Sequence, residues 1–267
     1  MVIENFFIQY KKPEQYIYWG ENYLDIYKAS DSDKGFIKTH SFDNVSLSTM
    51  NTSEFADMAR VLLHVDTGII MNSGPFIFNI FEFEKIPWQE GLKKELVEWR
   101  LKKVFPENID EYEHHFFKLD KKRILSVLFK KSLKEHIETL FRENGLSLTY
   151  LGNSTVETIN HIAKMKKDVP DIFIEMDKSL SITVFLGKGL PYYIRKFRAE
   201  QAADIVTEAA KTINFVKNSY ARVPRTCALM IRRSDIELHT VNDGLSKMEI
   251  LPLDLKNSEQ FIFPGKE

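Results

Sequence analysis

Cysteine is almost absent from this sequence, and its scarcity narrows the possible classes of protein. The chain has 267 residues and a single cysteine, Cys227. One thiol cannot form an internal disulfide, so a reducing compartment is the simplest expectation. The four residues that follow Cys227 are Ala, Leu, Met and Ile, which is typical of a buried strand. We therefore interpret Cys227 as an inert core thiol and not as a nucleophile.

An excess of charge of either sign is also missing. The 37 Lys and Arg residues almost balance the 38 Asp and Glu residues, which leaves a formal net charge of -1. Such a chain has no global field to attract nucleic acid, so a nucleic-acid partner is disfavoured. Small basic groups occur at 121–123, 130–131, 164–167 and 195–198. These are typical of solvated faces, with a patch for a membrane surface or an acidic partner as the alternative.

Long apolar runs are lacking as well. No run approaches the ~18 residues that a membrane-spanning helix needs, and residues 1–15 do not show the basic and then apolar segments of a signal peptide. We therefore expect contact with a membrane only through partners. The hydrophobic fraction of 43% and the charged fraction of 28% are near the averages for globular proteins, which disfavours disorder.

Familiar metal-ligand spacings do not occur among the histidines. His114 and His115 are neighbours in a predicted strand and point to opposite faces, so they are poor ligands for one metal ion. Three further histidines each stand alone on a predicted helix: His64, His136 and His161. The sequence predicts no metal site.

The first part of the chain shows a regular order of predicted elements. Three strands separated by turn residues predict an antiparallel meander: 15–19, 23–29 and 36–42. A helix follows with Thr52 or Ser53 as its N-cap, and its apolar face has helical spacing: Phe55, Met58, Ala59, Leu62 and Leu63. Residues 68–71 then indicate a buried strand. The order is βββαβ.

The same order returns later in the sequence. Strands are predicted at 171–175, 180–186 and 190–197. The second turn of this meander, Gly187-Lys188-Gly189, joins two strands and opens no helix, so it indicates a hairpin and not a phosphate loop. A helix over 199–220 and a buried strand over 226–231 complete a second βββαβ set.

A different unit lies between the two sets. A strand at 76–83, a helix from Pro87 to Pro106, and strands at 112–119 and 123–129 are followed by further elements. These are a helix capped by Ser132 and closed by Gly145, a strand at 146–150 and a helix at 154–164. We expect a first half at 1–165 with a small α/β insert at about 75–150, and a shortened second half at 166–267. The stretch from Asp243 onward is predicted either to add a last strand or to form a tail.

This order resembles the actin-like ATPase superfamily. The predicted fold class is α/β, with duplicated βββαβ actin-like (ribonuclease H-like) halves and a small α/β insert in the first half. The closer resemblance is to the PilM family of type IV pilus assembly proteins and to the cytoplasmic domain of the type II secretion protein L. Three passages carry it: 83–106, 134–162 and 174–197, the last with Gly-Lys-Gly-Leu-Pro. Phe197 leads directly into the long helix, so the lid subdomain of the second half is expected to be absent.

The turns depart from the pattern of nucleotide-binding relatives. Those turns carry Asp and Gly, because only Gly lets backbone N–H groups approach a phosphate closely. Here Glu21 stands in the first turn, Glu175 and Asp177 in the second, and Arg232 where the resemblance implies a Gly-Gly turn. We interpret these four residues as a vestigial nucleotide site with no cofactor, and we expect no enzymatic activity. The alternative is an ATPase or small kinase that binds Mg-ATP through Asp177 and Glu175.

Aromatic side chains gather in the predicted insert. Phe76, Phe78, Phe81, Trp88 and Trp99 are candidates for a groove that binds a partner, although most must form a core. The resemblance implies a scaffold that is cytoplasmic and peripheral to the inner membrane. It would bind the N-terminal cytoplasmic tail of a PilN-like bitopic membrane protein and join it to an assembly ATPase. An adaptor of another envelope complex is a further alternative.

Overall fold

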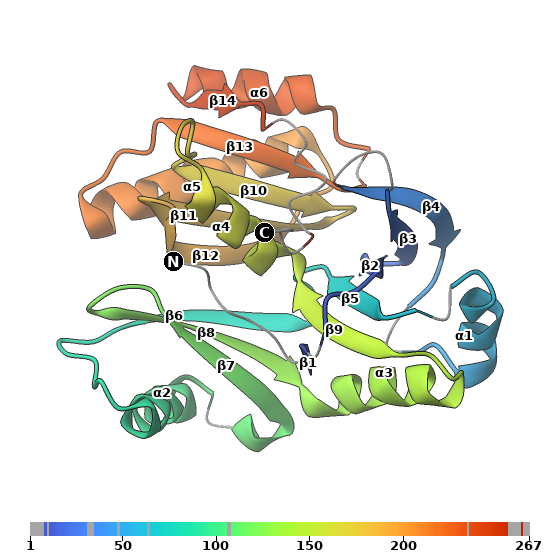
Figure 1. Cartoon of the computed structure of the whole chain (residues 1–267). Helices are drawn as coiled ribbons and strands as arrows, with labels where there is room; N and C mark the ends of the chain where they lie inside the picture. Colours follow the sequence, from blue (N-terminus) through green and yellow to red (C-terminus); the bar gives the residue numbers. More distant parts are fainter. Residues whose placement is uncertain are drawn as a thin grey trace. The chain divides into compact units, whose positions relative to one another are not determined.

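The computed structural model describes residues 8–9, 11–30, 35–46, 49–62, 65–105, 108–233, 235–255 and 263 (Figure 1). The chain divides into two compact units, which we call the N-terminal unit, Ile3–Asn153, and the C-terminal unit, Ser154–Gly265. The division falls before the helix at 154–164, so this helix belongs to the second unit. Among the described residues, no helix combines the length and the apolar character needed to cross a bilayer.

A six-stranded sheet is the centre of the N-terminal unit, with the order β1-β9-β5-β2-β3-β4. Its strands are β1 (Ile8–Gln9), β2 (Gln15–Trp19), β3 (Tyr23–Ala29), β4 (Phe36–Asp43), β5 (Thr67–Met71) and β9 (Leu148–Asn153). The pairs β2–β3 and β3–β4 are antiparallel, which confirms the predicted meander. Strand β5 runs parallel to both β2 and β9, and every residue of β2 and β5 is buried.

Two helices pack together beside this sheet, and both begin differently from the prediction. Helix α1 (Thr52–Ala59) is capped by Asn51, which forms a capping box with Glu54, so Thr52 and Ser53 are not the cap. Helix α3 (Lys131–Glu143) starts directly after a strand and has no side-chain cap, which makes the prediction for Ser132 wrong. Gly145 adopts a φ of 66° after α3, as a closing glycine should. The rings of Phe55 and Phe141 join the two helices, with 5.1 Å between centroids.

The insert is a three-stranded antiparallel sheet with the order β6-β8-β7 and a helix on one face. Its elements are β6 (Phe76–Glu82), α2 (Glu90–Val104), η1 (Ile109–Glu111), β7 (Tyr112–Lys118) and β8 (Arg123–Lys130). Val97 and Leu101 of α2 pack on Ile124 and Leu128 of β8. Strand β9 pairs with β5, so 148–153 continue the six-stranded sheet and are not part of the insert. Leu63, His64 and Pro106 lie outside the described residues.

The C-terminal unit is a five-stranded sheet with the order β12-β11-β10-β13-β14. Its elements are α4 (Ser154–Lys164), β10 (Ile172–Asp177), β11 (Leu180–Gly187), β12 (Leu190–Arg198), α5 (Ala202–Tyr220), β13 (Thr226–Ile231), α6 (Leu238–Lys247) and β14 (Leu251–Leu253). Strand β14 pairs parallel with β13, which decides the open question about this stretch in favour of a last strand. Residues 199–201 alone join β12 to α5, so no lid subdomain is inserted there.

The two large sheets share one strand order. In β4-β3-β2-β5-β9 and in β12-β11-β10-β13-β14, three antiparallel strands are followed by two that run parallel to the central strand. Along the chain, the elements β2-β3-β4-α1-β5 and β10-β11-β12-α5-β13 also follow the predicted βββαβ order. The predicted α/β fold class is therefore confirmed.

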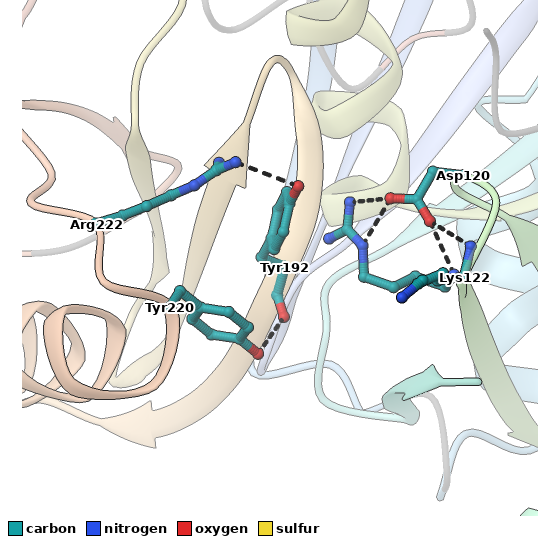
Figure 2. A network of polar contacts seen from close by, with 6 residues as sticks. Asp120, Lys122, Tyr192, Tyr220 and Arg222 are labelled. Atoms are coloured by element: carbon teal, nitrogen blue, oxygen red, sulfur yellow. Dashed lines mark hydrogen bonds and ion pairs between the residues drawn. The ribbon is translucent and has the colours of Figure 1, made fainter. Parts of the chain in front are cut away.

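Side-chain hydrogen bonds fix the β7–β8 turn in the N-terminal unit and the end of α5 in the C-terminal unit (Figure 2). In the insert, the carboxylate of Asp120 accepts the backbone N–H of Lys122 at 2.8 Å and binds the guanidinium of Arg123 at 2.8 Å and 2.6 Å. In the C-terminal unit, the Tyr220 hydroxyl donates to the backbone carbonyl of Tyr192 at 3.2 Å. The guanidinium of Arg222 lies over the ring of Tyr192, 4.7 Å from its centroid. These contacts hold the β7–β8 hairpin and tie the end of α5 to β12.

Candidate functional site

Two parallel strands of the C-terminal unit end side by side with charged residues. Strands β10 and β13 pair in parallel, so their carboxyl ends lie at one edge of the sheet. Glu175 and Asp177 are two residues apart on β10 and therefore share a face. They are only 3% and 2% exposed. Arg232 follows β13, and its backbone N–H donates to the carbonyl of Met176 at 2.9 Å, which holds Arg232 beside the end of β10.

A buried ion pair joins the two strand ends. The Nε of Arg232 lies 3.5 Å from Oε1 of Glu175, and the two side chains are 7% and 4% exposed. The other carboxylate oxygen of Glu175 accepts a hydrogen bond of 2.9 Å from the Thr155 hydroxyl, in the first turn of α4. A helix N-terminus also favours a neighbouring carboxylate. The negative charge of Glu175 is thus matched by groups of the protein itself.

In the turn after β10, a backbone N–H group is already hydrogen-bonded to another part of the protein. Lys178 adopts a φ of 53°, in the left-handed region where Gly is the usual residue. Its N–H donates to the carbonyl of Arg233. A phosphate bound at this turn would have to displace that contact. Among the described residues, no cluster of three or more His, Cys, Asp or Glu side chains could hold a metal ion.

Sequence analysis identified the three charged residues of this site but not the hydroxyl group that binds one of them. The structure brings Glu175 and Arg232 into contact and places Asp177 on the same face of β10. Glu21 lies in the N-terminal unit, in the turn between β2 and β3, where it is half-buried. Thr155 was missed by sequence reasoning. Its signal was the pair Ser154-Thr155 between a buried strand and a helix, where hydroxyls face whatever lies at the helix N-terminus.

The predicted aromatic groove divides into core and surface residues. Phe76 is fully buried and stacks on Phe129 with 4.8 Å between ring centroids, and Phe81 packs in the insert core at 9% exposure. These two residues therefore cannot line an open groove without unpacking that core. Phe78 is half-buried in β6. Trp88 and Trp99 are exposed.

Large exposed apolar side chains occur on α2 and two residues before its start. Trp88 is 84% exposed, Leu92 46% and Trp99 49%. Leu92 and Trp99 are seven residues apart, which places them on one side of the helix. The Nζ of Lys103 lies 3.8 Å from the centroid of the Trp99 ring, and the guanidinium of Arg100 lies 5.4 Å from it. We call Trp88, Leu92 and Trp99 the α2 ridge.

Comparison with known proteins gives a consistent result at the level of the fold. No protein-family model and no curated protein matches this sequence. A Bacteroides thetaiotaomicron protein with an actin-like ATPase fold and unknown function matches with a TM-score of 0.63 and 11% identity, over 95% of this chain and 96% of that chain.

Two further solved structures come from a secretion system and from a pilus biogenesis complex. The cytoplasmic domain of EpsL, an inner-membrane component of the type II secretion system of Vibrio cholerae, matches with a TM-score of 0.62 and 7% identity, over 93% and 92% of the two chains. The PilM–PilN type IV pilus biogenesis complex matches with a TM-score of 0.59 and 15% identity, over 94% of each chain. This chain therefore has the actin-like ATPase fold, in a form similar to the PilM structure and to the cytoplasmic domain of EpsL.

Proposed function

We propose that this chain is a cytoplasmic scaffold of an inner-membrane assembly platform for a type IV pilus or a type II secretion system. It binds the N-terminal cytoplasmic tail of a bitopic membrane partner and links it to an assembly ATPase. The likeness to EpsL and to the PilM–PilN complex supports this choice of system. The proposal includes the absence of a nucleotide cofactor and of enzymatic activity.

The observation that carries the proposal is the buried contact between Arg232 and Glu175. Mg²⁺ prefers carboxylate oxygens, but an ion at Glu175 would have to displace the Arg232 guanidinium and the Thr155 hydroxyl, which already bind this carboxylate. The backbone N–H of Lys178 also already donates a hydrogen bond within the protein. The groups that would bind a nucleotide thus bind one another, which favours a binding function over ATP turnover.

The α2 ridge is the surface that we assign to the membrane partner. An exposed tryptophan and leucine on one side of α2, with a second exposed tryptophan two residues before the helix, are typical of interfaces, where aromatic side chains supply most of the binding energy. Lys103 and Arg100 hold the Trp99 ring in place, so the ridge loses little freedom when a partner binds.

One observation favours a second candidate function. Asp177 is a buried carboxylate at the carboxyl end of β10, on the same face as Glu175. An actin-like ATPase or small kinase would use such a group on the metal side of Mg-ATP. This candidate predicts that Mg-ATP binds and that Asp177→Ala abolishes its binding.

Tryptophan fluorescence tests the scaffold directly. The chain has three tryptophans, and Trp19 is buried at 3% exposure, so a blue shift on binding reports on Trp88 and Trp99. The probes are synthetic peptides for the N-terminal tails of the bitopic membrane proteins encoded beside this chain. We expect one tail to shift the emission, and Trp88→Ala/Trp99→Ala to abolish its binding in a labelled-peptide assay. Phe215→Ala, an exposed aromatic of the C-terminal unit, is the matched control. Failure of every tail to bind at about 100 μM would contradict the proposal.

A further inference from the structure

The exposed side of helix α2 has the residue spacing by which two helices pack together. Four exposed residues on it are separated by three, four and three positions: Leu92, Glu95, Trp99 and Lys102. This spacing places their side chains along one side of the helix. Val97 lies on the other side, fully buried against the insert sheet. We call Leu92, Glu95, Trp99 and Lys102 the α2 seam.

Opposite charges lie toward the two ends of this seam. Three exposed charged residues of α2 form no ion pair with any residue that the structure describes: Glu95, Lys102 and Lys103. The other exposed charges of the helix are matched within it, because Glu90 contacts Lys93 and Lys94 lies 3.9 Å from Glu98. Glu95 precedes the two lysines by about two turns of helix. The seam is therefore negative in its first half and positive in its second half.

Antiparallel packing of two α2 helices matches these charges. A two-fold axis at Trp99 sets Glu95 of one copy opposite the partner's Lys103 and beside the partner's Lys102, and the symmetry repeats the contact. The two Trp99 rings meet at the axis, where an aromatic pair adds to binding. Parallel packing would set acid beside acid and lysine beside lysine, so like charges would repel. The charge pattern thus selects a second copy of this chain in the antiparallel orientation.

The contact that this arrangement makes is short. Helix α2 has 15 residues and is therefore about 22 Å long. One helix pair of this length is small beside the about 1,200–2,000 Å² that stable interfaces bury. We therefore expect a reversible pair with a Kd of about 10–100 μM, which another ligand of the same surface can displace.

We propose that two copies of this chain pair through the α2 seam in antiparallel orientation, and that this pairing covers the α2 ridge. Leu92 and Trp99 belong to both the seam and the ridge, so a copy of the chain and the tail of the membrane partner compete for them. The pairing regulates the site by keeping its tryptophan away from water until the tail binds. The competition rests on the proposed function, whereas the pairing itself does not.

Sedimentation of the full chain up to about 200 μM tests the pairing, since this concentration exceeds the expected Kd. Two variants each give the seam charge of one sign: Glu95→Lys, and Lys102→Glu/Lys103→Glu. The triple variant Glu95→Lys/Lys102→Glu/Lys103→Glu exchanges all three charges and restores the match only if the helices are antiparallel. Glu135→Lys, at an exposed position of α3, is the control for a change of net charge. The tail peptide that binds the wild type is then added to the paired protein.

We expect self-association of the wild type and of Glu135→Lys, association at least about tenfold weaker in the two single-sign variants, and recovery in the triple variant. The tail should return the wild type to a monomer. A monomeric wild type at about 200 μM, equal association of all variants, or no recovery in the triple variant would overturn the pairing. Tail binding without self-association would reject this inference and leave the proposed function standing. Self-association with no tail bound at any concentration would support the pairing and contradict the proposed function.

Discussion

Replacing Arg232 by methionine should destabilise the C-terminal unit strongly. Methionine keeps much of the side-chain length but removes the charge, so Glu175 stays buried with the Thr155 hydroxyl and without its cation. At 3.5 Å the attraction between the two charges is about 5 kcal/mol for an effective dielectric constant of about 20. Removing one member of a buried pair typically costs about 3–5 kcal/mol. We expect Arg232→Met to lower the free energy of unfolding by that amount, a large share of the about 5–15 kcal/mol of a typical protein.

Urea unfolding followed by circular dichroism is the suitable assay. All three tryptophans belong to the N-terminal unit, so their fluorescence reports mainly on that unit and serves as an internal control. The double variant Glu175→Gln/Arg232→Met removes both charges and should be more stable than the sum of the single effects predicts, by about 2 kcal/mol. If Arg232→Met changes the free energy of unfolding by less than about 0.5 kcal/mol, the ion pair is not buried as described and the reasoning fails.

Three further predictions concern buried polar groups. Thr155→Val should lower the free energy of unfolding by about 1.5–3 kcal/mol in urea unfolding, whereas Thr158→Val, whose buried hydroxyl has no partner in the described part of the chain, should change it by less than about 0.5 kcal/mol. Because burial lowers the pKa of His114 and His115, the unfolded chain binds protons first as the pH falls. The free energy of unfolding should therefore decrease from pH 7 to pH 5, and His114→Gln/His115→Gln should make this decrease smaller. A larger decrease in the double variant would refute the prediction. Burial raises the pKa of the Cys227 thiol to about 12, so iodoacetamide should modify it at pH 8 only in urea, and mass spectrometry that finds rapid native labelling would be a contrary result.

Turn residues made the strands predictable, whereas some helix limits depended on contacts that a sequence does not display. The predicted bounds of β2 and β3 agree with the structure because turn residues separate them. Helix α6 was not predicted, since its sequence is polar and contains Gly244. It is fixed by burial of Val241 and Leu245 and by a close approach of Gly244 to Val206. Tertiary packing overrides weak helix propensity there.

Burial of the aromatic residues could not be predicted from the sequence. Strand β6 carries apolar side chains on both faces, so the period of two that separates a core face from a solvent face is missing. Phe76 therefore could not be distinguished from an exposed residue. Helix α2 has tryptophan on its outer side, where polar residues are usual, and only the structure shows that this side is uncovered within the insert. The charged residues Glu175 and Arg232 were identified because they stand where the resemblance places the nucleotide-binding turns, but their contact required the parallel pairing of β10 and β13.

Thermal unfolding of the purified chain with and without millimolar Mg-ATP tests the central claim most directly. A ligand at a hundred times its Kd stabilises the native state by about 2.7 kcal/mol, which raises the melting temperature by several degrees. Because Arg232 and Thr155 already bind Glu175 and the N–H of Lys178 is used within the protein, we predict no change in melting temperature. A rise of several degrees that disappears in Asp177→Ala would contradict the scaffold account and favour a nucleotide-binding protein.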